Sequence, residues 1–328
     1  MSKALLKHMR HNKKGVFYLL LSTLFIMIMI VVFLAYKEYN YTDKQKVVET
    51  RVLTINDFIK SIDTDSGRVI YISGFRALIA LEDYVTHSRY LNDTELEERF
   101  RDAFYEGTVN GIPVYILTDS SYTDYLNRLR ITANQLGLGI DINVTNVSLS
   151  QTTPWSVTVA VTTHININDT KGLAKWDFNK TYATNVSLIN IRDPIYSLST
   201  YGLVFNTIRI SSITHFVNGS NDTTNLSLQI NNSYYVSNAL APSFLMRMTG
   251  NFSSSACCGI ESLVNIQKLW DQSVNYSNSK SIVDYILFTN VTDYTNLTCN
   301  FQNMPSWFKM DSNHTAKYEI SNLSNSPC

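Results

Sequence analysis

An uncharged apolar segment near the N-terminus sets the first limit on the architecture of this chain. Residues 16–36, from Val16 to Tyr36, read VFYLLLSTLFIMIMIVVFLAY and contain no Asp, Glu, Lys or Arg. As a helix rising about 1.5 Å per residue, the segment is roughly 30 Å long, which matches the hydrocarbon core of a bilayer. A helix in a soluble core has polar residues along one face, but only Ser22 and Thr23 are mildly polar here. The segment therefore predicts one membrane-spanning helix, with the lipid bilayer as its partner.

The charges on either side of this segment predict its orientation. The leader, residues 1–15, contains five basic residues and no acidic one: Lys3, Lys7, Arg10, Lys13 and Lys14. Because basic flanking segments stay on the cytoplasmic side of a membrane, we expect a cytoplasmic N-terminus and an extracellular C-terminus in a single-pass cell-membrane protein. A cleaved secretory signal fits less well, since the apolar segment is long and no small-residue cleavage motif follows it. The chain has 27 basic and 27 acidic residues and thus no net charge, which argues against nucleic acid as a partner.

The outer part of the chain is rich in Asn-x-Ser/Thr sequences, which are acceptor motifs for N-glycosylation. Seventeen such sequons occur, and all lie beyond the predicted span. This one-sided distribution predicts a heavily glycosylated surface protein. The acceptor residues are Asn40, Asn92, Asn143, Asn146, Asn168, Asn179, Asn185, Asn218, Asn221, Asn225, Asn231, Asn251, Asn275, Asn290, Asn296, Asn313 and Asn322.

The four cysteines lie close to the C-terminus, at Cys257, Cys258, Cys299 and Cys328. An even number in an extracellular segment predicts two disulfides, for which three connectivities are possible. Because a bond between adjacent cysteines closes a strained ring, we expect Cys257 and Cys258 each to pair with Cys299 or Cys328. No CxxC motif or nearby pair of histidines supports a metal site, so none is expected. The disulfides are expected to tie together a C-terminal lobe.

The composition changes near residue 138, and residues 37–137 are expected to form a helical extracellular region. Residues 48–62 carry an apolar seam with heptad-like spacing, which runs from Val48 to Ile62. Residues 63–67 read DTDSG and predict a turn, and residues 68–90 predict a return helix that completes a hairpin. The seam is expected to contact that return helix or like subunits. A capping box at residues 94–97 and apolar spacing at 119–136 predict two further helices.

Residues 138–328 are expected to form a β-rich glycosylated ectodomain. Residues 139–149, 155–167, 176–191 and 225–230 alternate between apolar and polar side chains and are rich in Val, Ile and Thr. This pattern is typical of an antiparallel sheet with one solvated face. The fold class is therefore α+β: a transmembrane helix, a helical stalk or hairpin, an antiparallel sheet and a disulfide-tied lobe.

Residues that would indicate an enzyme are sparse. The chain contains no phosphate-binding loop, HExxH motif or GxSxG motif. Asp311 and His314 are close in sequence, but His314 lies inside a sequon, which predicts an exposed loop. Glu261 and Asp284 would form paired carboxylates only if the fold joined them. We therefore expect no enzymatic activity and no cofactor.

The N-terminus resembles the class III signal peptide of archaeal type IV pilins and pilin-like surface proteins. The resemblance covers residues 1 to about 62 and rests on the leader ending in Lys13-Lys14-Gly15, followed at once by the apolar helix. It implies that a prepilin peptidase cleaves between Gly15 and Val16, after which the helices bundle into a filament core or hold a membrane-anchored subunit. Many pilins carry a Glu at the fifth position after the cleavage site, where this chain has Leu20. That difference and the large ectodomain favour a minor or non-assembling subunit.

The resulting hypothesis is a membrane-anchored, N-glycosylated archaeal cell-surface protein. Its pilin-like character would serve adhesion or envelope interaction, and the protein would be associated with the membrane or a filament. One alternative is a membrane-tethered extracellular hydrolase with Asp311, His314 or Glu261 in its site. Another is a viral-type envelope glycoprotein, which would have the same topology and sequon density.

Overall fold

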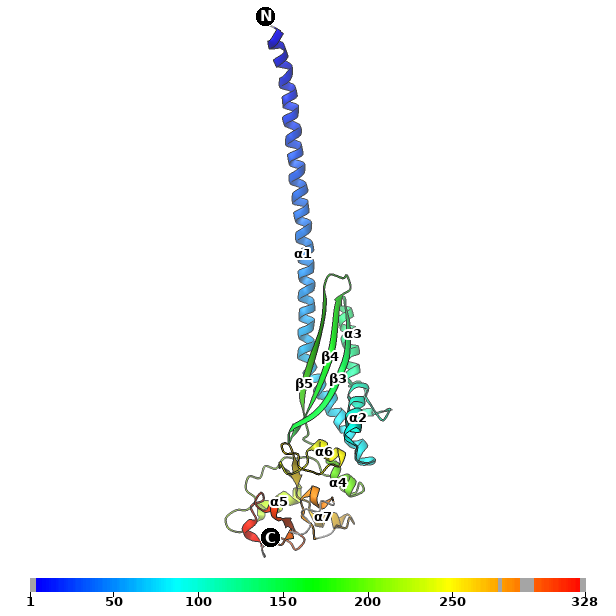
Figure 1. Ribbon diagram of the computed structural model, residues 1–328, viewed down its shortest axis with the longest axis vertical. Coiled ribbons are helices and arrows are strands. Elements are labelled where there is room, and N and C mark those ends of the chain that lie inside the picture. The colour runs from blue at the N-terminus through cyan, green and yellow to red at the C-terminus, as the bar shows by residue number, and fades with distance from the viewer. Residues whose placement is uncertain (1–3, 277–278, 290–297, 325–328) are drawn as a thin grey trace.

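The long helix α1 (Ala4–His87) dominates the computed structural model, which describes residues 4–276, 279–289 and 298–324. Figure 1 shows this helix as a rod whose N-terminal part projects away from the rest of the chain, which gathers around its C-terminal part. The helix contains 84 residues and is thus roughly 130 Å long. The predicted apolar span lies in the projecting part.

The expected helical hairpin does not form, because α1 continues without interruption through residues 63–67. Contacts to strand β5 (Lys175–Ser187) hold this stretch in the helix. The carboxylate of Asp63 accepts hydrogen bonds from Lys180 Nζ at 2.6 Å and from the Tyr182 hydroxyl at 2.9 Å. The Thr184 hydroxyl also donates to the carbonyl oxygen of Gly67 at 3.1 Å. Tertiary contacts of this kind override the weak helix propensity of Asp and Gly.

Three long strands form an antiparallel sheet in the order β3 (Leu138–Thr153), β4 (Ser156–Asp169) and β5, which confirms the predicted antiparallel sheet. Alternate residues of β4 are buried, as Val157, Val159 and Val161 show, so this face packs in the core against α1. The helix comes especially close at Gly74. A Cβ atom there would lie 3.1 Å from a Val186 methyl and 3.2 Å from a Val159 methyl.

Two shorter helices, α2 (Asp93–Glu106) and α3 (Tyr122–Gln135), pack against α1 and β3. The capping box of α2 uses Asn92 and Glu95, two residues earlier than the predicted box, because the Asn92 side chain accepts from the Glu95 amide. Between the helices lie β1 (Thr108–Val109), β2 (Ile112–Pro113) and the 3-10 turn η1 (Tyr115–Leu117). These elements share one hydrophobic core with α1 and the sheet.

The remainder of the described chain forms a lobe of short elements with a second hydrophobic core. Figure 1 places this lobe beyond the end of the sheet, at the opposite end of the molecule from the N-terminus. Its strands pair as β6 (Tyr235–Ser237) with β7 (Ile260–Ser262) and β8 (Thr298–Cys299) with β9 (Met310–Asp311). Its helices and the 3-10 turn η3 are α4 (Pro194–Ser199), α5 (Thr224–Asn232), α6 (Phe244–Thr249), α7 (Ile266–Asp271), α8 (Asp284–Leu287), α9 (Ser312–Thr315) and η3 (Ser321–Leu323).

The predicted strand at residues 225–230 is wrong, because these residues belong to helix α5. Leu226, Gln229 and Ile230 are the buried positions of the helix. Their spacing of three and four residues matches one face of a helix. The stretch is short enough for both periodicities to fit, and packing against the lobe core decides between them.

The disulfide pairing also differs from the expectation, because Cys257 and Cys258 are bonded to each other. Backbone hydrogen bonds from Ser255 and Ala256 to the carbonyls of Ala241 and Ala239 hold this segment in a tight turn. Cys258 is buried, with its Sγ atom 3.1 Å from the carbonyl oxygen of Gln151 in β3. Cys299 is disulfide-bonded as well, whereas Cys328 lies outside the described residues.

Candidate functional site

The exposed apolar part of α1 is the first candidate functional site. Within the described residues, one helix is long and apolar enough to cross a membrane, and its most apolar window has a mean hydropathy of 2.8 with none of it buried. Exposed large side chains extend from Val16 to Tyr36. Exposing an apolar surface of this extent to water is unfavourable in free energy, so such a surface indicates contact with a membrane or with another protein. The segment thus has the length and surface of a membrane anchor.

The C-terminal end of this segment carries residue types that are favoured at a membrane interface. Tyr36 and Tyr39 are two-thirds exposed and flank Lys37, the first charge after the apolar run. Tyr and Lys are favoured at the headgroup level of a bilayer. At the other end lies Gly15, the residue before the predicted cleavage point, and a Cβ atom there would have no neighbour within 4 Å.

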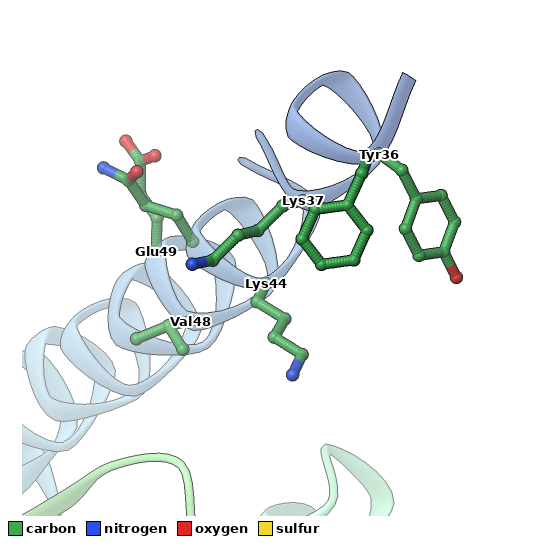
Figure 2. A pocket seen from close by; sticks show the side chains of 7 residues that line it. Tyr36, Lys37, Lys44, Val48 and Glu49 are labelled. Atoms are coloured by element: carbon green, nitrogen blue, oxygen red, sulfur yellow. The ribbon is translucent and has the colours of Figure 1, made fainter. Parts of the chain in front are cut away.

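A shallow hollow of about 990 Å³ lies just beyond the apolar segment. Its lining residues all belong to α1: Phe33, Tyr36, Lys37, Lys44, Gln45, Val48 and Glu49. Figure 2 shows their side chains on successive turns of this single helix. A hollow lined by one helix does not enclose a small molecule in the way ligand pockets do. The hollow is therefore part of the exposed surface of α1.

The acceptor residues of the predicted sequons lie mostly on the surface. Asn290 and Asn296 lie outside the described residues, and the side chain of Asn40 is not among those described. Of the other fourteen, thirteen are exposed and Asn225 is half-buried. The Asn225 amide nitrogen donates to the carbonyl oxygen of His215 at 2.8 Å. The two buried asparagines among the described residues, Asn206 and Asn265, do not belong to sequons.

The core of the lobe contains a cluster of buried charges centred on Arg247. Its guanidinium lies 2.6 Å from an oxygen of Asp193 and 3.0 Å from one of Asp284, and all three side chains have no exposed surface. Burial lowers the pKa of Arg247, but the two carboxylates outweigh it and raise the pKa overall. Burial also raises the pKa of Asp284, against the opposing charge of Arg247. The cluster therefore holds a permanent cation between two carboxylates.

A second buried cluster joins residues that the sequence left isolated. His314 Nδ1 lies 2.7 Å from Asp311, while its Nε2 lies 3.3 Å from Glu261 and 3.0 Å from the Tyr285 hydroxyl. The Tyr318 hydroxyl donates to the other oxygen of Glu261 at 2.9 Å. Burial would lower the pKa of His314, but the hydrogen bonds and charges of the two carboxylates raise it to about 9. The imidazole is thus a cation at neutral pH.

The structure corrects the expectation that His314 lies on an exposed loop. Although its neighbour Asn313 is exposed, His314 itself has no exposed surface and Asp311 is 1% exposed. Glu261 is also fully buried, so a substrate has no access to these three side chains in this structure. Within the described part of the chain, no group of three or more His, Cys, Asp or Glu side chains is arranged to hold a metal ion. The cluster is an internal ionic contact rather than an open catalytic site.

Arg247 and Asp193 did not appear among the sequence-predicted site residues. The available signal was a single charge within the apolar stretch from Phe244 to Met248. Such a charge is rarely buried unless it is paired, so it pointed to a partner without identifying one. Asp193 precedes Pro194, and this pair is typical of a turn, so it does not indicate a buried ion pair.

Comparison with known proteins yields no relative: no protein-family model, curated protein or solved structure matches this chain.

Proposed function

We propose that this chain is a membrane-anchored, N-glycosylated archaeal cell-surface protein, and a pilin-like subunit of the minor or non-assembling kind. Its role would be mechanical, in adhesion or envelope interaction, with the N-terminus in the cytoplasm and the C-terminus outside the cell. The observation that carries the proposal is the exposed apolar surface of α1, which projects as a rod away from the folded part (Figure 1). The basic leader and the surface position of the sequon asparagines support the proposed orientation.

The continuity of α1 explains how such a protein would transmit force. The same helix contains the apolar segment and, farther along, the residues that pack under the sheet, such as Ile70 and Leu78. No flexible linker therefore separates the anchor from the ectodomain. A load on the ectodomain passes directly along the helix to the membrane or to a filament.

The seam at residues 48–62 is divided between two roles in this proposal. Ile55 and Ile62 are buried in the chain's own core, so they are unavailable to a neighbour. Val48, the first residue of the seam, is 37% exposed. Contacts with like subunits are therefore proposed to use the Val48 end of the seam, together with the apolar segment.

Membrane anchoring is tested by alkaline extraction of membranes from cells that express the full chain. The protein should remain in the pellet, because the apolar segment supplies favourable transfer into lipid. Ile26→Arg combined with Ile30→Arg should release it, since each central Arg costs about 3 kcal/mol of insertion free energy. Leu53→Arg, an exposed position beyond the segment, is the matched control and should leave the protein in the pellet. Recovery of the wild-type chain in the soluble fraction would contradict the proposed anchor.

Pilin-like processing is tested separately by N-terminal sequencing and intact mass of the native protein. The mature chain should begin at Val16. Gly15→Leu should retain the leader while leaving the ectodomain folded, because the surroundings of Gly15 are open. A native chain that still begins at Met1 or Ser2 would exclude the processing step but not the membrane anchor.

A further inference from the structure

The three-stranded sheet carries five of the predicted glycan acceptors. Their positions concern its outward face, which is the face that points away from α1 and the core. The five acceptors are Asn143 and Asn146 on β3, Asn168 on β4, and Asn179 and Asn185 on β5. The strand register allows each of them to be assigned to a face, because successive side chains of a strand point to opposite sides of the sheet.

The register places all five acceptors on the same face. On β4, Thr158, Thr162, His164 and Asn168 are separated by even numbers of residues, so they face one way, opposite to the buried Val157, Val159 and Val161. Asn143 and Asn179 both pair with His164, Asn146 pairs with Thr162, and Asn185 pairs with Thr158. All five acceptors are exposed.

A β-bulge brings Asn143 and Asn146 to the same face. These residues are three positions apart, so in a regular strand they would point in opposite directions. The register shifts between Val144 and Asn146, which leaves Thr145 as the extra residue and restores Asn146 to the outward side. Val144 and Val147 consequently both pack against the core. The bulge therefore adds one acceptor to the outward face without exposing a valine.

Small side chains lie between the acceptor positions on the outward face. A row of small side chains, Ser148, Ala160 and Ala183, crosses the three strands between the acceptor positions. At Asn185 the Thr158 hydroxyl donates to the side-chain oxygen at 2.8 Å, which leaves the amide nitrogen directed away from that bond. Asn225 is the contrasting case, because its amide nitrogen is already engaged with a carbonyl oxygen.

We propose that the outward face of the sheet β3–β4–β5 is a glycan-bearing surface, with sugars on the Nδ2 atoms of Asn143, Asn146, Asn168, Asn179 and Asn185. The proposal rests on the extracellular orientation given under Proposed function. The donor is a lipid-linked oligosaccharide phosphate. A bond forms between Nδ2 and the anomeric carbon, the bond from that carbon to the phosphate oxygen breaks, the amide nitrogen loses one proton and the lipid phosphate leaves.

Such a surface would exclude protein partners from this side of the sheet. Partners would then have to use other surfaces, such as the side formed by α2 and α3, where the predicted acceptor is Asn92 at the start of α2 and residues 93–137 contain no sequon. The sequence identifies the acceptors, but only the register and the bulge show that they cover one face.

Glycopeptide mass spectrometry of the full chain, purified from the membranes of its native cells, tests the site assignment. The five sheet acceptors should be occupied, and Asn225 should be bare. Thr145→Ala should remove only the glycan at Asn143, whereas Thr145→Ser, which keeps the sequon, should retain it. Occupied lobe sites such as Asn218 and Asn251 with bare sheet sites would overturn the inference and leave the proposed topology intact. Absence of glycans at every sequon would overturn both.

Thiol labelling tests whether the sugars cover the face. Ala183→Cys lies in the small-residue row and is exposed, and Ile131→Cys on α3 is the matched control because Ile131 is 60% exposed. A bulky maleimide should label Ala183→Cys several-fold more slowly in the glycosylated protein than in a variant with the five acceptors changed to Gln. The control should label equally in both. Equal labelling of Ala183→Cys would show that the face is not covered and would overturn the proposal.

Discussion

The guanidinium of Arg247 lies 2.6 Å from the carboxylate of Asp193, and both side chains are fully buried. Asp193 also caps helix α4, because its other oxygen accepts the backbone N–H of Ile195 at 3.0 Å. On its second side Arg247 reaches Asp284, the first residue of α8. One side chain thus joins α6, on which it lies, to the beginnings of two other short helices.

We expect Arg247→Met to destabilise the lobe strongly. The substitution preserves much of the volume but leaves two buried carboxylates without their cation, a change that typically costs about 3–5 kcal/mol. Urea denaturation of the detergent-solubilised chain should show the loss, whereas Arg209→Met at an exposed position should have little effect. If the single variant does not fold, Arg247→Met combined with Asp193→Asn and Asp284→Asn should recover folding. An unchanged midpoint in Arg247→Met would contradict the ionic role.

The second buried cluster predicts a loss of stability at alkaline pH. The folded pKa of His314 is about 9, above its ordinary value of 6.5. Because its pKa is raised in the folded state, His314 stabilises the fold fully below pH 6.5. This stabilisation is lost as the pH rises through 9. The contribution is on the order of 3 kcal/mol, since each pKa unit corresponds to about 1.4 kcal/mol.

The measurement is the free energy of unfolding between pH 6 and pH 9.5, a range chosen around the two pKa values. The decline should be present in the wild type and absent in His314→Gln. Glu261→Gln removes one of the two carboxylates that raise the pKa, so it should move the decline to lower pH. A slope that persists in His314→Gln would assign the effect to another group.

The parts of the fold that were predictable are those with long, regular patterns. The apolar segment and the strands β3, β4 and β5 extend over more than ten residues each, so their periodicity is unambiguous. The turn predicted at residues 63–67 failed because it depended on local propensity alone. The bonds from Lys180 and Tyr182 to Asp63 come from residues 117 and 119 positions away, and no local pattern reveals them.

The two buried clusters could not be predicted from the sequence for the same reason. Glu261, Asp311 and His314 come from β7, β9 and α9, and the sequence does not show which short elements meet. The prediction that His314 is exposed was also wrong, because a sequon indicates an exposed asparagine and carries no information on the exposure of its neighbours. In α9 the exposed Asn313 and the buried His314 are adjacent residues, and consecutive side chains of a helix point in different directions.

Glu82 predicts a second loss of stability with rising pH, in a lower pH range than that of His314. Burial raises its pKa to about 7, although Arg192 lies 3.5 Å away and opposes the shift. Its Oε1 atom has no hydrogen-bond partner among the described residues. Because the pKa of Glu82 is higher in the folded state, the protein loses stability as the pH rises from 4.5 through 7.

Glu82→Gln should therefore be more stable than the wild type at pH 8, with the difference shrinking at acidic pH. Thermal unfolding at several pH values measures this. Glu95→Gln is the control with reversed direction, because the hydrogen bonds from Arg89 and the Asn92 amide lower the pKa of Glu95 to about 2. Greater stability of the wild type at pH 8 would show that the Arg192 contact outweighs the burial of Glu82.

The bond between Cys257 and Cys258 predicts a simple peptide map. Trypsin cleaves after Arg247 and Lys268, so both cysteines lie in one peptide, residues 248–268. Without reduction, that deglycosylated peptide should appear alone, lighter than its reduced form by the lost thiol hydrogens. Recovery only as a cross-link to the peptide that contains Cys299 would contradict the pairing.

The close approach of α1 to the sheet predicts opposite responses at two glycines. At Gly67 a Cβ atom would lie 3.5 Å from the Thr184 hydroxyl, which is an ordinary contact. Gly67→Ala should thus be neutral or stabilise the protein by up to about 1 kcal/mol through better helix propensity. At Gly74 the methyls of Val159 and Val186 already lie within 3.2 Å of the Cβ position. Gly74→Ile should separate helix and sheet and destabilise the protein by about 1–3 kcal/mol, as overpacking does.

Both variants are compared by urea denaturation and by hydrogen exchange of the β4 amides. In Gly74→Ile, exchange should accelerate along Val157 to Val161, the buried side of the strand that faces the helix. Gly67→Ala should leave that exchange unchanged. Equal stability of the two variants would mean that the helix can move away from the sheet without loss. That result would contradict the rigid connection between anchor and ectodomain on which the proposed mechanical role depends.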